Sequence, residues 1–465
     1  MGRSRCWRLV GLIGLAGSLT CGCGVAFAQI DGGVLTSTGS DPYPRYFHAA
    51  SRLDNGLVMV TGGLTISFIP PTLISRTEIS FYEPASGVFS TTFHPLNGDP
   101  AVTPALAAAR SSHTQTTLPD GRVLITGGNT GASGTSPGTP IASVEVFDPW
   151  TGSVSAGPAM SAARAMHTAT SLPDGRVVVA GGGTWQVFDW VSDTWSASYA
   201  LAKTRTAHAA VLLPDYAGTA GDNRVLLVGG SGSGPASCEL LDPDAGSTTL
   251  LTATLATGVD DLAAVALPDG RVFIAGGQDL TTGDTIPDTY LLDPVADQLT
   301  PAPDLPNRAG GAADQQIVRT GWHVVLLGGE QQASGVDTVL DYVAVFDASA
   351  GAWLDDGAML TVHDDFAAVP LTNCRTLIID GGVPFLGEEV PSPNCEVLEF
   401  TDPAICLSGD LNNDGAVTAA DQAAFSPCCS GPGAAPAPNE CLNADLDADG
   451  DADLRDFAAL QRAAG

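Results

Sequence analysis

The chain has 465 residues, of which 51 are acidic and 19 basic, so its formal net charge is −32. This charge argues against binding to nucleic acids or anionic membranes, because both require clustered Lys and Arg. Hydrophobic residues make up 44%, and 55 Gly and 32 Pro indicate frequent tight turns, so we expect a folded all-β protein.

The N-terminus predicts a secretory signal peptide over residues 1–28. Three arginines precede an apolar run from Leu9 to Leu19, and Ala26-Phe27-Ala28 forms an A-x-A cleavage site. The apolar run is shorter than the roughly 20 residues that span a bilayer, so we predict no membrane span. A lipoprotein anchored at Cys21 or Cys23 is the alternative, but the residues before these cysteines fit a lipid-attachment pattern poorly.

A repeat organises most of the chain. Glycine pairs end apolar, β-rich runs at 62–63, 127–128, 181–182, 229–230, 276–277, 328–329 and 381–382. In the second unit a strand (113–118) leads through an Asp-Gly turn (119–121) into a second strand (122–126), which ends at the glycine pair (127–128). A loop (129–143), a third strand (144–148) and a turn (149–152) follow. Each unit is therefore predicted to be a four-stranded antiparallel sheet.

Seven such sheets predict a seven-bladed β-propeller over residues 29–403. One four-stranded sheet cannot bury both its faces, whereas a ring of seven can. The seventh unit lacks a fourth strand before the composition changes near residue 401. Gly33 stands 12 residues before Arg45, as Gly152 stands before Arg164, so we expect the strand at 33–36 to complete the last blade.

The repeat resembles kelch repeats over roughly residues 30–403. It shares the double glycine, an R-x-x-H motif at the start of a blade, and aromatic residues at Phe147, Phe188, Phe346, Trp195 and Trp353. The resemblance implies a kelch propeller similar to the central domain of galactose oxidase-like proteins. Propellers of this kind serve both as binding modules and as enzyme scaffolds, so the resemblance leaves the chemistry open.

The R-x-x-H motifs are the first candidate site residues: Arg45 and His48, Arg110 and His113, Arg164 and His167, and Arg205 and His208. Because the pair recurs in four blades, we interpret it as structural. A copper-radical oxidase would need a Tyr-His step, a distant His and a Tyr linked to Cys. The chain has no Tyr-His dipeptide, and Cys238, Cys374 and Cys395 lack the expected neighbours. We therefore assign no catalytic and no cofactor-binding residue.

Other candidates in the propeller are weaker. Acidic residues could pair as glycosidase carboxylates at Asp260, Asp261, Asp364, Asp365, Glu388 and Glu389, although the acidic composition alone explains such pairs. Trp185, Trp190 and the loops 65–73 and 131–140 could line a binding face, or the loops could reflect ordinary length variation.

Two twelve-residue loops of EF-hand type predict that residues 404–465 form a small domain that binds two calcium ions. Positions 1, 3, 5, 7, 9 and 12 of the first loop are Asp410, Asn412, Asp414, Ala416, Thr418 and Asp421. In the second loop they are Asp445, Asp447, Asp449, Asp451, Asp453 and Asp456. An acidic linker is the alternative, but it does not explain two complete sets of ligand positions.

A helix is predicted after each calcium loop, over Ala419–Phe425 and Leu454–Ala463, and this duplicated unit resembles type I dockerin repeats. The resemblance implies a cohesin-like or cell-surface protein partner. Export also predicts disulfides among six late cysteines, at Cys374, Cys395, Cys406, Cys428, Cys429 and Cys441. Bridges from Cys441 to Cys428 or to Cys429 both remain open, and Cys238 is expected to be a buried thiol.

Together these features predict a secreted, extracellular or surface-bound binding protein. Much Ala, Gly and Asp with a single lysine, Lys203, indicates a GC-rich bacterial gene. We expect a propeller without enzymatic activity that presents a binding face, with a calcium-dependent tail for anchoring; a glycan ligand is left open. The alternative is a carbohydrate-active oxidase, lyase or hydrolase tethered through a dockerin.

Overall fold

The computed structural model describes residues 27–30, 32–68, 71–308, 310–372, 374–385, 388–400 and 402. The predicted calcium loops, and most of the predicted signal peptide, lie outside these residues. Strands dominate the described part, where the one helical segment is a 3-10 turn at Tyr216–Gly218. No helix there has the length and apolar character needed to cross a membrane.

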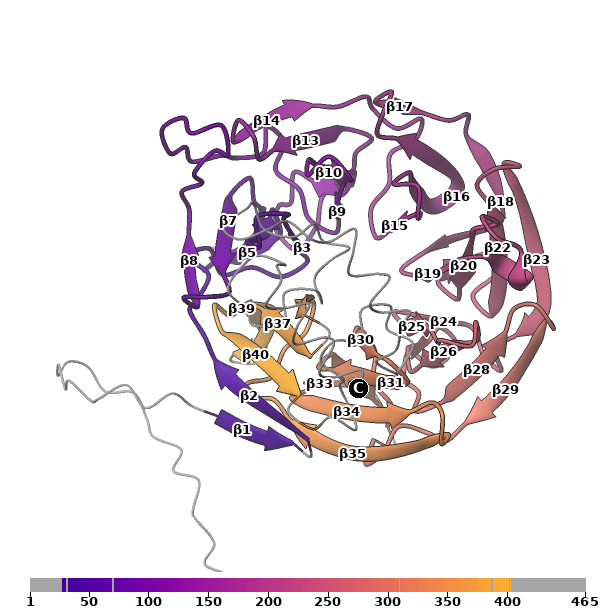
Figure 1. Ribbon diagram of the computed structural model, residues 1–465. Helices are drawn as coiled ribbons and strands as arrows, with labels where there is room; N and C mark the ends of the chain where they lie inside the picture. Colours follow the sequence, from indigo (N-terminus) through magenta and orange to yellow (C-terminus); the bar gives the residue numbers. More distant parts are fainter. Residues whose placement is uncertain are drawn as a thin grey trace, which may run out of the picture.

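Seven antiparallel sheets surround a central axis and form a seven-bladed β-propeller (Figure 1). Blades 1 to 3 contain β3 (Ala49–Arg52), β4 (Val58–Thr61), β7 (Ile79–Glu83) and β8 (Val88–Ser90); β9 (Thr114–Thr117), β10 (Val123–Thr126), β13 (Val144–Asp148) and β14 (Ser153–Ala156); and β15 (Thr168–Ser171), β16 (Val177–Asp189) and β17 (Thr194–Trp195). In blade 3 the second and third strands are one continuous strand, β16.

The later blades repeat the order. Blades 4 to 6 contain β19 (Ala209–Leu213), β20 (Arg224–Val228), β22 (Ser237–Asp242) and β23 (Ser247–Thr254); β25 (Ala263–Ala266), β26 (Val272–Ala275), β28 (Thr289–Asp293) and β29 (Gln298–Ala302); and β30 (Gln316–Thr320), β31 (His323–Leu327), β34 (Tyr342–Asp347) and β35 (Ala352–Ala358). Blade 7 contains β36 (Ala367–Thr372), β37 (Arg375–Ile379), β40 (Cys395–Phe400), β2 (Gly33–Ser37) and β1 (Phe27–Ile30).

Short strands decorate the loops that follow the glycine pairs. Hairpins form from β5 (Leu64–Phe68) and β6 (Pro71–Ser75), β11 (Asn129–Thr130) and β12 (Thr139–Pro140), β32 (Glu330–Ala333) and β33 (Val336–Val339), and β38 (Gly382–Phe385) and β39 (Glu388–Pro391). The remaining short pairings involve β18 (Tyr199–Thr206), β21 (Ser231–Gly232), β24 (Val259–Asp260) and β27 (Gln278–Asp279).

The N-terminal strand β2 closes the ring. It pairs antiparallel with β40 in blade 7, from Gly33 opposite Phe400 to Ser37 opposite Glu396, and the two strands lie side by side in Figure 1. This is the pairing that the spacing of Gly33 and Arg45 predicts. Strand β1 adds to β2 and begins at Phe27, so cleavage after Ala28 would remove its first two residues.

The core lies between adjacent blades, where the recurrent aromatic residues meet. Phe147 of blade 2 packs edge-on against Phe93, with ring centroids 5.1 Å apart. In the same way Phe346 of blade 6 stacks on Phe273 of blade 5, at 4.6 Å. All four rings are essentially inaccessible to solvent, and burying each contributes roughly 1.5–3 kcal/mol. The aromatic position of the repeat therefore joins neighbouring blades.

The glycine pairs of blades 1, 2, 4, 5 and 6 adopt a backbone that other residues rarely take. Gly127 and Gly128 have φ of 59° and 94°, and a Cβ on Gly127 would lie 2.5 Å from the Arg164 carbonyl oxygen. In blade 7 the prediction of a pair at 381–382 is wrong by one residue. Asp380 and Gly381 take these positions, with φ of 52° and 105°, because the preceding Ile379 pairs with Ala367 as Thr126 pairs with Thr114.

Candidate functional site

A pocket of about 290 Å³ lies at the axis, where the first strand of each blade begins. Its lining comes from every blade and comprises Phe47, His48, Ser112, His113, Met166, His167, Ala207, His208, Asp261, Leu262, Asp314, Gln315, Gln316, Asp365 and Phe366. Each blade contributes at least two consecutive residues, which stand directly before or at the start of its first strand. The repeat thus brings seven equivalent positions to one place.

One residue per blade forms what we call the axial ring: Phe47, Ser112, Met166, Ala207, Asp261, Asp314 and Asp365. Each is a non-glycine residue with φ between 49° and 55°, a conformation that costs on the order of 1 kcal/mol or more. Six backbone hydrogen bonds of 2.9–3.0 Å link these residues around the axis. In each, the amide of one ring residue donates to the carbonyl of the ring residue in the preceding blade, so the run starts at the Asp314 amide and ends at the Asp365 carbonyl. These bonds hold the strained backbone and connect the blades.

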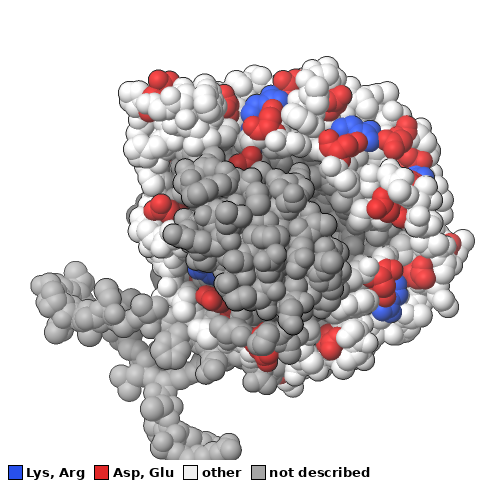
Figure 2. Space-filling view, in the orientation of Figure 1, with Lys and Arg blue, Asp and Glu red and all other residues white. Residues whose placement is uncertain are grey.

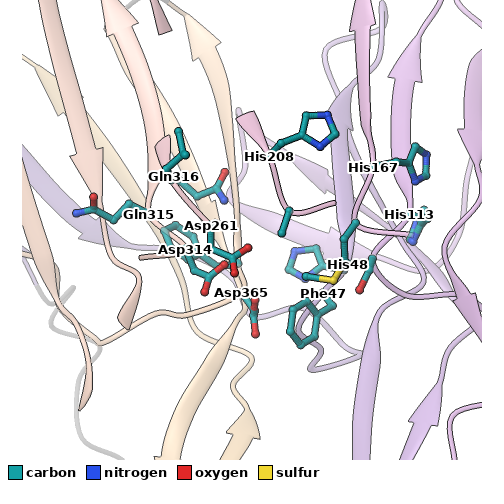
Figure 3. Close-up of a pocket in the computed structure, with 15 residues that line it drawn as sticks. Phe47, His48, His113, His167, His208, Asp261, Asp314, Gln315, Gln316 and Asp365 are labelled. Atoms are coloured by element: carbon teal, nitrogen blue, oxygen red, sulfur yellow. The ribbon is translucent and has the colours of Figure 1, made fainter. Parts of the chain in front are cut away.

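Histidines and aspartates occupy opposite sides of the pocket, as Figure 3 shows for His113, His167 and His208 against Asp261, Asp314 and Asp365. The histidines come from blades 1 to 4 and the aspartates from blades 5 to 7. The pocket is therefore asymmetric in charge although its backbone is nearly symmetric.

Three of the four histidines bind a threonine of the preceding blade. Nε2 of His113 lies 2.9 Å from Oγ1 of Thr61, and Nε2 of His167 lies 2.9 Å from Oγ1 of Thr126. Nε2 of His208 lies 3.0 Å from Oγ1 of Thr168. Burial, with a smaller effect of nearby arginines, lowers the pKa of His167 and of His208 to about 3. These side chains are therefore neutral at neutral pH.

The arginines of the motif form part of the framework. Each is almost fully buried, and Arg45, Arg110, Arg164 and Arg205 each donate from Nη1 to the carbonyl of the first glycine of their own blade, over 2.6–3.1 Å. Nη2 of Arg205 also lies 2.5 Å from Oε1 of the buried Glu239. Together with the histidine bonds, these contacts support the structural interpretation of the R-x-x-H motifs.

The aspartate side of the pocket differs from the histidine side at the position of the motif arginine. Where blades 1 to 4 have the motif arginine, blades 5, 6 and 7 have Val259, Ala312 and His363. Burial, and then the charges of Asp260 and Glu330, raise the pKa of Asp261 to about 7. Burial and the neighbouring carboxylates also raise the pKa of Asp314.

Asp314 belongs to a close acidic cluster. Its carboxylate, and those of Asp364 and Asp365, offer oxygens that all lie within 4.8 Å of one another. Asp364 and Asp365 are among the acidic pairs predicted from the sequence, whereas Asp314 is not, although it precedes β30 by the same interval as Asp261 precedes β25. Comparing these positions across blades would have found it. Glu388 and Glu389 lie in β39.

Two further predictions need correction. Trp185 does not line a binding face, because it is completely buried in blade 3, where its Nε1 donates to Thr248 Oγ1 over 3.0 Å. Cys395 is a free, buried thiol and forms no disulfide. Cys238 is also buried and free, as expected, and Cys374 is disulfide-bonded. Trp190 is half-buried and donates to the carbonyl of Asp174.

Acidic side chains are spread over the visible surface of the ring, and the few basic ones lie beside them (Figure 2). Arg122, for example, contacts Asp120 and Asp193, and Arg176 contacts Asp174 and Asp244. The described surface therefore offers no basic patch for a polyanion.

Comparison with known proteins supports both parts of the chain. Residues 408–463 match the model of the dockerin type I domain. The propeller is similar in fold to a solved structure described as a novel fungal alcohol oxidase with catalytic diversity among the AA5 family, in complex with copper; the TM-score is 0.55 at 14% identity, covering 81% of this chain and 76% of that one. No curated protein sequence matches. The chain is thus a seven-bladed propeller followed by a dockerin type I domain.

Proposed function

We propose that this chain is an exported bacterial binding protein whose dockerin domain anchors it to a cohesin-bearing partner outside the cell. The dockerin match at residues 408–463 carries this proposal, because it includes both twelve-residue loops, 410–421 and 445–456. Each loop would hold one calcium ion through the side chains or carbonyls at positions 1, 3, 5, 7, 9 and 12. The signal peptide at residues 1–28 accounts for export.

The propeller supplies a rigid platform for recognition. Its motif arginines and most of its motif histidines are committed to internal hydrogen bonds, so the axial pocket and the loops around it remain as the surface for a ligand. A glycan or a protein is the class of ligand we propose for this face. Binding without turnover fits these residues, because burial lowers the pKa of His167 and His208 to about 3 and makes them weak bases.

Capture on an immobilised type I cohesin tests the anchoring role. Full-length protein should bind in millimolar calcium and be released by EGTA, because the loops fold around the ion. The variant Asp410→Ala/Asp445→Ala should not be captured. The control Asp120→Ala/Asp174→Ala, which changes the charge equally on the propeller, should bind normally. Capture that is unaffected by EGTA or by the loop substitutions would refute the proposal.

A carbohydrate-active enzyme is the second candidate, favoured by the fold shared with a copper-bound alcohol oxidase. Among the described residues, the one close group of three or more His, Cys, Asp or Glu ligands contains three aspartates and no histidine, so this group does not fit a copper centre of mixed ligands. We therefore derive no step through copper. Turnover of any alcohol or polysaccharide that is lost in Asp314→Asn, with the fold intact, would favour the enzyme.

A further inference from the structure

We propose that a second pocket, between blades 4 and 5, binds a neutral saccharide. It has a volume of about 490 Å³ and is lined by the β19–β20 connection and the β25–β26 turn, so we call it the hairpin pocket. This inference goes beyond the anchoring function and does not depend on it. It rests on a long loop in blade 4, on an aromatic side chain held in place, and on polar atoms that the fold leaves unused.

The hairpin pocket and the axial pocket lie at opposite ends of the first strands. The residues of the axial pocket stand before these strands or at their start, whereas Leu213 and Ala266, which line the hairpin pocket, are the last residues of β19 and β25. A strand rises about 3.3 Å per residue, so the two pockets are separate. A volume of about 490 Å³ falls within the roughly 300–1,000 Å³ of sites for small molecules.

A long connection in blade 4 forms one wall of the hairpin pocket. Ten residues, 214–223, join β19 to β20, whereas five residues join the equivalent strands of blades 2, 3 and 5, at 118–122, 172–176 and 267–271. Asp215 and Ala217 in this connection have φ of 47° and 54°, a strained backbone for residues other than glycine. Strain of this kind clusters at sites that bind ligands.

Tyr216 supplies an aromatic surface in this wall. Its Oη donates to the carbonyl oxygen of Pro294 in blade 5 over 2.8 Å, which fixes the ring between the two blades. The guanidinium of Arg224 lies 5.9 Å from the ring centroid, and its Nε lies 2.6 Å from Asp222. The ring is thus held before a ligand arrives, so packing the apolar side of a sugar against it loses little conformational entropy.

Arg271 provides hydrogen-bond donors that the fold does not use. Its equivalents Arg122 and Arg176 each pair with an aspartate of the next blade. The corresponding turn of blade 6, at 348–351, contains no acidic residue. Arg271 pairs through Nε with Asp269 of its own turn, and its Nη1 and Nη2 have no partner among the described residues.

Asp215 and Asp293 provide the matching acceptors. Oδ1 of Asp215 accepts from the Gly221 amide over 2.6 Å, and Oδ1 of Asp293 accepts from two amides of its own turn. In the described part of the chain, Oδ2 of each aspartate has no hydrogen-bond partner. A sugar hydroxyl both donates and accepts, so adjacent hydroxyls can use these oxygens together with the Arg271 guanidinium.

The charge of the lining selects a neutral ligand. Three aspartates, Asp215, Asp269 and Asp293, and one arginine, Arg271, line the pocket and give it a formal charge of −2. This charge repels phosphates, sulfates and acidic sugars. A small cation would leave the donors of Arg271 unused and would be repelled by them. A neutral saccharide uses the donors, the acceptors and the aromatic surface at once.

Isothermal titration calorimetry tests the proposal on the full-length protein. The probes are neutral hexasaccharides of cellulose, xylan, mannan and starch, with hexagalacturonic acid as the acidic comparison. At least one neutral probe should bind, and the acidic one should not. Binding of none of the neutral probes, or of the acidic probe alone, would refute the proposal.

A pair of matched variants locates the binding site. Arg271→Gln/Asp293→Asn keeps the net charge and should weaken binding roughly tenfold or more, because hydrogen bonds to charged groups are lost. The control Arg122→Gln/Asp148→Asn changes the equivalent residues of blade 2 and should bind like wild type. Equal affinity of the pocket variant and wild type would place the saccharide elsewhere and overturn the proposal.

A loop exchange tests the wall of the pocket. Replacing residues 215–223 by Asp-Gly gives blade 4 the Pro-Asp-Gly turn of blade 2, at 119–121, and removes Tyr216. This variant should lose saccharide binding and should still be captured on cohesin in calcium, because the dockerin domain is unchanged. Saccharide binding at wild-type affinity in the loop variant would overturn the hairpin pocket, whatever the result of cohesin capture.

Discussion

Nε2 of His113 lies 2.9 Å from Oγ1 of Thr61, across the boundary between blades 2 and 1. The Thr61 hydroxyl donates its proton to Gln115 Oε1, so it accepts from the Nε2–H of His113. This assigns the histidine tautomer and shows that the motif histidine joins neighbouring blades.

Thr61→Val should lower the free energy of unfolding by about 1–3 kcal/mol, because it leaves the buried His113 nitrogen without a partner at nearly constant volume. Urea denaturation measures the change. Ile379→Thr is the matched control, since it introduces a hydroxyl at the equivalent position facing His48 and should be neutral or stabilising. Equal stability of Thr61→Val and wild type would contradict the assignment.

Acid should destabilise the propeller through its histidines. The pKa of His167 is about 3 in the folded protein and about 6.5 when unfolded, so the unfolded chain binds more protons between these values. The stability that neutral His167 contributes is complete above pH 6.5 and is lost as the pH falls toward 3, by up to ~1.4 kcal/mol per pH unit. Asp261, with its pKa raised to about 7, acts in the opposite direction.

Because these contributions partly cancel, the comparison with His167→Gln is more informative than the total pH profile. The variant keeps a side chain that can hydrogen-bond Thr126 but does not titrate. Urea denaturation at pH 7, 6, 5 and 4 should show wild type losing stability faster than the variant as the pH falls. A constant difference between the two proteins over this range would show that His167 does not titrate as proposed.

The buried ion pair of Arg205 and Glu239 should contribute far more to the stability of the folded protein than an ion pair at the rim. Arg205→Met leaves the carboxylate buried without its partner and should cost about 3–5 kcal/mol. The control Arg271→Met breaks a pair with Asp269 that is about one-third exposed on each side, and should cost less than 1 kcal/mol. Chemical denaturation of both variants checks this, and similar losses would contradict it.

The repeat made most of the fold predictable from sequence. Positions that need a special backbone, such as Gly127 and Gly128, are visible because few residues tolerate φ near 60–90° there. The same rule predicted the wrong pair in blade 7, at Gly381 and Gly382. There Asp380 takes the first position, with φ of 52°, and Gly381 takes the second. The missing fourth strand of blade 7 was predictable because an unpaired strand edge requires a partner.

The axial pocket was harder to predict because it depends on contacts between blades. Asp261, Asp314 and Asp365 are each unremarkable in an acidic sequence, and only their equivalent backbone positions bring them together. Trp185 was misjudged for a related reason. The loop that follows the glycine pair in the second unit has no counterpart here, since β16 continues from Val177 to Asp189 and carries the Trp185 side chain into the core.

Closure of the ring by β2 is the claim on which the axial ring, the pocket and the blade contacts all depend. Amide hydrogen exchange followed by mass spectrometry measures it directly. The amides of Gly33–Ser37 should exchange as slowly as those of β37, since β2 is paired with β40 and opens only with the blade. Exchange of Gly33–Ser37 at the rate of an unstructured terminus, with β37 still protected, would contradict the account.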